Sequence, residues 1–139
     1  MIGHLSDNVL TTRSINATAA GTTDINGTSV DTSTVPADAV RAVCSLGTLT
    51  ATQVTKLIIE DSPDDVTFTA IKTGTAAPDA DSNKLLIVDV SLKGKARYVR
   101  ATVDRGTANA VIDGVTLEFY RLRTEKVSQH ANVSKLDLA

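Results

Sequence analysis

Apolar and polar residues alternate with a period of two in several stretches of this chain, and that period is typical of half-buried β-strands. After Pro36, one face of residues 40–46 carries only apolar side chains, and the stretch ends at Gly47. The positions on this face are Val40, Ala42, Cys44 and Leu46. The spacing therefore predicts a strand over residues 40–46.

The same pattern recurs at short intervals, with Gly, Pro, Asp or Asn between the stretches. It predicts further strands over residues 54–60, 66–71, 84–92, 97–104 and 110–122. A Ser-Pro-Asp-Asp turn joins the first two of these strands into an expected hairpin. The apolar run within residues 84–92 predicts a well-buried strand.

Alternation also assigns the inward faces of the last two strands. The side chains expected to share a face are Val99, Ala101 and Val103 in residues 97–104 and Val115, Leu117 and Phe119 in residues 110–122. Asp113 and Gly114 mark either a tight turn or a β-bulge. We favour the bulge, because the apolar stretch that precedes them is short.

Short strands at this spacing, without an amphipathic helix or an internal repeat, indicate an all-β fold. We predict an antiparallel β-sandwich or jelly roll with extended terminal arms, and a closed barrel is the alternative. Residues 1–33 are expected to form an N-terminal arm with a weak first strand over residues 25–30. Residues 34–123 then form the sandwich core, and residues 124–139 form a C-terminal arm.

Composition narrows the class of protein further. The 139 residues suit one domain, and the 20 threonines and 15 valines favour strands over helices. A net charge of -2 counts against a partner with a phosphate backbone, and no apolar run approaches the ~20 residues that span a bilayer. We therefore expect no nucleic-acid partner and no membrane partner. The first residues lack the features of a secretory signal, so no export is expected.

Groups suited to catalysis are scarce in this sequence. Its two histidines, His4 and His130, fall in the expected arms, where rigid catalytic geometry is hard to maintain. Cys44 lies in an apolar run and is interpreted as a small buried hydrophobe. The acidic cluster in residues 60–65 does not have the spacing of a calcium loop, and local turn hydrogen bonds explain it better. The sequence thus predicts a protein that is not an enzyme, with no catalytic, metal-binding or cofactor-binding residues.

Basic residues concentrate in and beside the last two predicted strands. They are Arg97, Arg100, Arg105, Arg121 and Arg123. If those two strands pair, some of the guanidinium groups share a face. Arginine suits bidentate ion pairs at subunit contacts, but on an exposed strand it also serves solubility alone. Both interpretations stay open, and these arginines are the first candidates for a protein interface.

The C-terminal arm supplies the second set of candidates. Its isolated apolar residues are Val127, Val133, Leu136 and Leu138. A segment that orders on a neighbouring subunit covers a large surface, and Leu136 and Leu138 would be its anchors. The alternative is that this segment frays in solvent.

Two segments resemble small structural proteins of tailed bacteriophages. The first is KARYVRATVDRGTANAVIDGVTLEFYR, residues 95–121, and the second is IIEDSPDDVTFTAI, residues 58–71. The resemblance spans residues 29–121 and implies a capsid decoration protein, also called a cement protein. Such proteins are rich in β-structure, are often trimeric and lie outside the shell where neighbouring capsomers meet.

The resemblance also implies partners and a location. The expected partners are the major capsid protein and further copies of this chain in a homotrimer, on the outer capsid surface of the virion after synthesis in the host cytoplasm. The role would be to bridge neighbouring coat subunits and stabilise the shell. A head fibre base, neck or tail protein is the first alternative. A glycan-binding module is the second, and the aromatic content of 3% counts against it.

Overall fold

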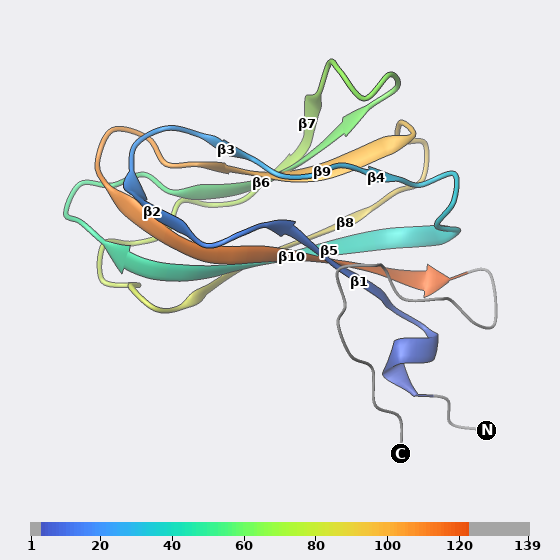
Figure 1. Ribbon diagram of the computed structural model, residues 1–139, viewed down its shortest axis with the longest axis horizontal. Coiled ribbons are helices and arrows are strands. Elements are labelled where there is room, and N and C mark those ends of the chain that lie inside the picture. The colour runs from blue at the N-terminus through green and yellow to red at the C-terminus, as the bar shows by residue number, and fades with distance from the viewer. Residues whose placement is uncertain (1–3, 123–139) are drawn as a thin grey trace.

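The computed structural model describes residues 4–122, which fold into two antiparallel sheets packed face to face (Figure 1). Sheet A contains, in spatial order, β1 (Leu10–Ile15), β10 (Ala110–Leu122), β5 (Ala37–Leu49) and β8 (Leu85–Ser91), and β2 (Thr18–Gly21) also pairs with β10. Sheet B contains β9 (Tyr98–Asp104), β6 (Lys56–Ser62) and β7 (Thr69–Thr73), and β3 (Ile25–Asn26) and β4 (Val30–Asp31) pair with the other side of β9. A 3₁₀ turn, η1 (Leu5–Asp7), precedes β1. The predicted all-β sandwich is confirmed.

The two sheets remain separate layers. Within residues 4–122 no strand pairing joins sheet A to sheet B, so the closed-barrel alternative is wrong for this part of the chain. The jelly-roll connectivity stays a prediction.

The core lies between the sheets and contains alternate residues of β5, β6, β9 and β10. All the inward-facing side chains predicted for residues 40–46, 97–104 and 110–122 are 2% exposed or less. Burial of each large apolar side chain stabilises the folded state by roughly 1.5–3 kcal/mol. The period of two in the sequence therefore identified the main faces of the core correctly.

Two glycines in the long central strands have different roles. β5 continues through Gly47, where we predicted its end, because a Cβ there would lie 2.7 Å from the Val111 side chain and the missing side chain permits close packing. Gly114 has a φ of 141° and lies where the pairing of β10 with β5 shifts its register. The predicted β-bulge at Gly114 is confirmed.

β8 is not the well-buried strand that its apolar sequence predicts. It lies at the edge of sheet A and pairs with β5 alone among the described strands. Val88 faces the core, whereas Leu85 and Ile87 on the opposite face are 57% and 54% exposed. A short apolar run does not distinguish a central strand from an edge strand, because strand order is a tertiary property.

β9 and β10 do not pair, so the condition for a shared arginine face is not met. β9 belongs to sheet B and pairs with β6, whereas β10 belongs to sheet A and pairs with β5 and β1. The connection at residues 105–109 therefore crosses from one layer to the other. Alternating sequence defines the faces of a strand but not its neighbours.

The predicted N-terminal arm is wrong for the residues from Leu10 onward. β1 pairs with β10, and Leu10 and Ile15 are buried in the core. Ser14 is also buried, and its hydroxyl donates to the Thr28 carbonyl oxygen at 3.2 Å. A polar strand can thus lie inside the sandwich when its hydroxyls bond to backbone, and its low apolar content concealed it in the sequence. The weak strand predicted over residues 25–30 is divided into β3 and β4.

The predicted hairpin is confirmed as β6 and β7, which pair in antiparallel register. β7 begins at Thr69, three residues after the predicted start at Val66. The Asp64 carboxylate accepts the backbone N–H groups of Val66 and Thr67 at 3.0 and 2.9 Å, and these bonds hold both residues in the turn. The same hydrogen bonds lower the pKa of Asp64.

Within residues 4–122, no helix is long and apolar enough to cross a membrane. Cys44 is fully buried in β5, and its burial raises the pKa of the thiol to about 12. The thiol is therefore protonated at neutral pH and packs as a small apolar group, as the sequence predicted.

Candidate interaction surface

The predicted arginine cluster is dispersed over the molecule. Arg97 directly precedes β9 and Arg100 lies within it, in sheet B. Arg105 lies in the crossing connection, and Arg121 lies near the end of β10 in sheet A. Arg123 and the apolar candidates of the C-terminal arm lie outside the described residues. These are Val127, Val133, Leu136 and Leu138. The arginines therefore lie at separate sites and do not form one basic face.

Arg97 forms a bidentate ion pair with Asp31 and joins β4 to the start of β9. Its Nε and Nη2 donate to the two carboxylate oxygens at 2.8 and 2.7 Å. The guanidinium also lies 5.1 Å from the centre of the Tyr98 ring. The pKa of Asp31 is well below its ordinary value of 3.8, first because of the Arg97 hydrogen bond and then because of Ser33. Arg97 remains more than half exposed, so its role in a subunit contact stays a prediction.

We expect Asp31→Asn to reduce the dependence of stability on pH in acid. A carboxylate whose pKa is lowered by folding stabilises the protein above its unfolded value of 3.8 and loses that effect as the pH falls toward the folded value. The test is the free energy of unfolding measured from pH 6 to pH 2 by circular dichroism in denaturant. Below about pH 4 the variant should show a shallower decline than the parent. An Asp24→Asn variant, which removes an exposed carboxylate, should match the parent, and equal curves for all three proteins would contradict the expectation.

Arg100 is held on the outer face of sheet B. Its Nε donates to Glu60 at 2.7 Å, and its guanidinium carbon lies 3.8 Å from the centre of the Phe68 ring. The Thr102 hydroxyl donates to the same Glu60 carboxylate at 3.0 Å. Only 19% of the Arg100 side chain is exposed, so most of this group is used inside the subunit.

Arg105 is not available as an interface residue, which corrects the prediction. The residue is 4% exposed, and its Nε and Nη1 donate to the carbonyl oxygens of Thr23 and Ala19, both at 2.7 Å. Nη1 also donates to the Ala110 carbonyl oxygen at 3.1 Å, and Nη2 to the Thr23 hydroxyl at 3.1 Å. The guanidinium thus ties the β2–β3 connection to the start of β10. Its fork of fixed donors suits several carbonyl oxygens at once.

The outer face of sheet A is the surface that sequence reasoning missed. Charged and aromatic side chains cross its strands in one row: Arg41 Nη2 donates to Glu118 at 2.7 Å, and the Tyr120 hydroxyl donates to Asp89. The bond to Asp89 is the main cause of a raised pKa of Tyr120. Sequence reasoning could not identify this row, because the strand order is needed to see that these residues meet.

A hollow of about 310 Å³ lies over this row. It is lined by Leu5, Val9, Arg41, Asp89, Glu118 and Tyr120. These residues come from the N-terminal segment and from three strands of sheet A, and Leu5 is 74% exposed. We call this surface, from Leu5 across to Ile87 on β8, the sheet A face. It combines exposed apolar groups with charged groups that already have partners, a combination common at protein interfaces.

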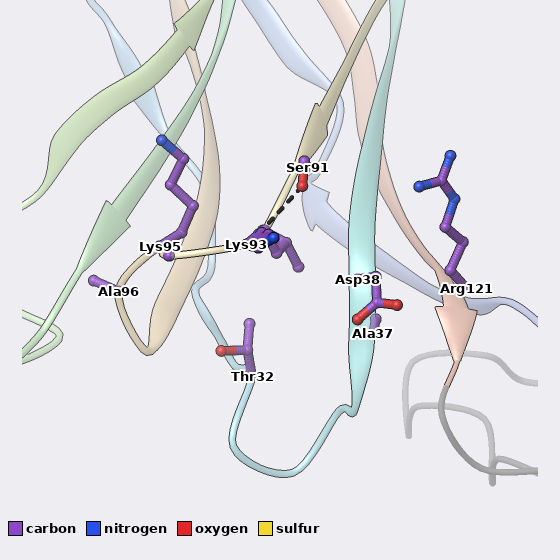
Figure 2. A pocket seen from close by; sticks show the side chains of 10 residues that line it. Thr32, Ala37, Asp38, Ser91, Lys93, Lys95, Ala96 and Arg121 are labelled. Carbon is purple, nitrogen blue, oxygen red and sulfur yellow. Dashed lines mark hydrogen bonds between the residues drawn. The ribbon is translucent and has the colours of Figure 1, made fainter.

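A larger hollow, of about 610 Å³, lies at the end of the sandwich where β5 begins and β8 ends (Figure 2). Lys93 and Lys95 flank Gly94 in the turn after β8, and Asp38 of β5 faces the same space. The Lys93 backbone N–H donates to the Ser91 hydroxyl at 3.3 Å, the bond drawn in Figure 2. Arg121 lines the hollow, and Figure 2 shows its guanidinium directed away on the other side of β5. The arrangement presents lysines to solvent and has no paired nucleophile and base among its lining residues.

The carboxylates of residues 60–65 have hydrogen-bond partners within the subunit. Glu60 pairs with Arg100, Asp61 accepts the Ala96 backbone N–H at 2.7 Å, and Asp65 accepts the Ser29 hydroxyl. Within the described range, no group of three or more metal-ligating side chains comes together. The local turn hydrogen bonds that the sequence predicted here are made by Asp64, whereas Glu60, Asp61 and Asp65 bond to residues distant in the sequence.

Comparison with known proteins gives a shared fold. No family model matches the sequence, and no curated protein matches it. The chain is similar to the crystal structure of the PBSX exported protein XepA, with a TM-score of 0.61 and 18% identity over 100% of this chain and 46% of XepA. It therefore spans less than half the length of XepA.

Two other solved structures have lower TM-scores. The disulfide-linked pili of Bacillus endospore appendages match with a TM-score of 0.46 and 19% identity, covering 82% of this chain and 89% of the other. The xylan-binding module CBM15 matches with 0.42 and 12%, covering 84% and 94%. The chain thus has a β-sandwich fold in common with one half of XepA.

Proposed function

We propose that this protein is a structural component of a phage particle and binds the outer surface of the capsid as a cement protein. The single observation that carries the proposal is the sheet A face, where exposed apolar groups surround charged groups that are already paired. The resemblance of residues 95–121 to phage structural proteins supports the same role. The fold shared with the PBSX exported protein XepA agrees with a β-sandwich subunit.

The sheet A face is suited to a coat-protein contact for a physical reason. Apolar groups such as Leu5 contribute to binding when water leaves the contact. Arg41 and Glu118 already share a hydrogen bond of 2.7 Å, so covering them leaves no unpaired charge. Binding to such a face therefore does not require the subunit to rearrange its charged groups.

A cement protein stabilises a shell through mass action. A subunit that bridges two coat proteins binds the assembled shell and not the separated parts, so it shifts the equilibrium toward the shell. Each bridge also adds interface area that must be broken before neighbouring coat proteins separate. A cement protein must bind the surface of another protein, and the exposed apolar groups and paired charges of the sheet A face are suited to such a contact.

We expect Leu5→Asp to lower binding to capsids about tenfold, because it places an uncompensated carboxylate on the apolar side of the contact. The measurement is cosedimentation of the purified chain with particles that lack it, quantified by gel densitometry. Val66→Asp is the matched control, since Val66 is 79% exposed in the β6–β7 turn of sheet B. Equal occupancy for both variants and the parent would remove the sheet A face from the proposal.

The position in the particle decides between a cement protein and the neck, head fibre or tail alternatives. Copies of a cement protein repeat over the icosahedral shell, whereas a neck or tail protein occupies one vertex. An image reconstruction of the virion in which this sandwich fits density across the shell would support the proposal. Density confined to a single vertex would overturn it. The homotrimer implied by the resemblance stays a prediction.

A further inference from the structure

We infer that the free edge of β8 pairs with the β8 edge of a second copy of this chain, antiparallel and about a two-fold axis. This contact would extend sheet A across two subunits. It goes beyond the proposed function, because it concerns a contact between copies and not the contact with a coat protein.

The first observation is the unpaired edge. β8 is the last strand of sheet A and uses only its β5 side in strand pairing among the described residues. Its other side presents backbone N–H and C=O groups over seven residues. Such an edge is a template for another strand.

The second observation is the apolar character of the edge. Leu85 and Ile87 lie on the outer face of the strand with more than half of their surface exposed. Leu86 and Val90 on the inner face are partly exposed, and both pack against the core. A strand added at this edge would cover apolar side chains on both faces. An edge that stays in solvent does not explain why these side chains are apolar.

The charge pattern selects a second β8 as the occupant. Asp89 is the one ionisable residue in the strand, and its carboxylate accepts the Tyr120 hydroxyl. An antiparallel pair centred on Val88 overlaps all seven residues and places Asp89 opposite Ile87 of the other copy. No like charges then face each other, and the inner side chains Leu86, Val88 and Val90 form a continuous apolar row across the axis.

The edge strand of sheet B behaves as edge strands usually do. β7 ends sheet B, and its sequence Thr-Ala-Ile-Lys-Thr carries an exposed lysine, Lys72, near its centre. A charged side chain at that position discourages pairing with another strand. β8 also carries one charged residue beside its centre, Asp89, but that carboxylate is already bonded to the Tyr120 hydroxyl of the same subunit.

The expected dimer is weak in free solution. A contact made by one seven-residue strand from each copy is smaller than the roughly 1,200–2,000 Å² buried in stable complexes. We expect a dissociation constant between about 10 µM and 1 mM. Copies held side by side on a particle have a high effective concentration, so a larger fraction of them would form this contact there.

The test is sedimentation velocity of the full chain over a range of concentrations up to about 1 mM. The parent should shift from 14.6 kDa toward twice that mass as its concentration rises. Ile87→Asp should weaken dimerisation at least about tenfold, because it places a second carboxylate directly opposite Asp89 of the other copy. Val66→Asp, at an exposed apolar site in the β6–β7 turn, should leave the dimer unchanged.

A short bismaleimide cross-linker then tests the two-fold axis. Ile87→Cys should give a covalent dimer, because Ile87 lies one residue from the axis and its two copies are diagonal neighbours across it, within reach of the linker, whereas Val66→Cys should not. Cys44 is fully buried and does not compete. A monomer at all concentrations, a dimer insensitive to Ile87→Asp, or a dimer that Ile87→Cys does not cross-link would each overturn the inference. Because Ile87 belongs to the sheet A face, the Leu5→Asp variant separates the two proposals: it should dimerise like the parent while its capsid binding falls.

Discussion

Replacing Arg105 by methionine is expected to lower the free energy of unfolding by about 3 kcal/mol. The methionine fills similar volume but removes four hydrogen bonds from a charged donor to the backbone and hydroxyl of Thr23 and to the carbonyls of Ala19 and Ala110. The carbonyl oxygens then lose their partner in a site where Arg105 was 4% exposed. Buried acceptors without donors account for most of the expected loss.

Denaturant unfolding followed by circular dichroism measures this change. Arg121→Met is the matched control, since Arg121 is exposed at the end of β10 and should cost less than about 0.5 kcal/mol. Hydrogen exchange should also show that the backbone of residues 18–24 loses protection in the Arg105 variant. Equal destabilisation by the two methionine variants would contradict the role assigned to Arg105.

Replacing Gly114 by alanine is the change with the second largest expected effect, a loss of about 2 kcal/mol in the free energy of unfolding. Gly114 has a φ of 141°, a conformation that residues with a Cβ rarely adopt. The new Cβ would also lie 3.2 Å from the Ile15 carbonyl oxygen, so β1 would have to move away from the bulge.

Gly94→Ala separates the two contributions. Gly94 also has a positive φ, of 73°, but a Cβ there would meet nothing within 4 Å. Its replacement should therefore cost about 1 kcal/mol, the strain of the backbone alone. If both variants unfold at the same denaturant concentration, the contact of Gly114 with β1 has no energetic importance.

The sequence predicted the sandwich and its inward faces because burial on one side of a strand imposes a local period of two. Val115, Leu117 and Phe119 could be assigned to the core from spacing alone, and so could the bulge at Gly114. The turn before β7 was also predictable, since Asp64 bonds to backbone groups only two and three residues away. Each of these features depends on neighbours in the sequence.

The candidate surfaces could not be predicted, because their residues bond to partners that are distant in the sequence. Arg105 looked like an exposed connection residue, but three of its four hydrogen bonds go to residues 19 and 23, more than 80 positions earlier. Arg41 and Glu118 are 77 positions apart, so their pairing on the sheet A face could not be anticipated. The sequence alone does not show on which surface a basic residue lies, because that depends on the strand order.

By itself, the sequence determined that this protein is built of short antiparallel strands and which side chains of the main strands are inward. Only the tertiary structure decided that β9 and β10 lie in different layers, that β1 belongs to the core and that the apolar β8 lies at an edge. The physical reason is that alternation records the burial of a residue on its own strand, whereas strand order is set by contacts summed over the whole sandwich. An apolar strand such as β8 has the same sequence signature at the centre of a sheet and at its edge, but only an edge strand can pair with another subunit.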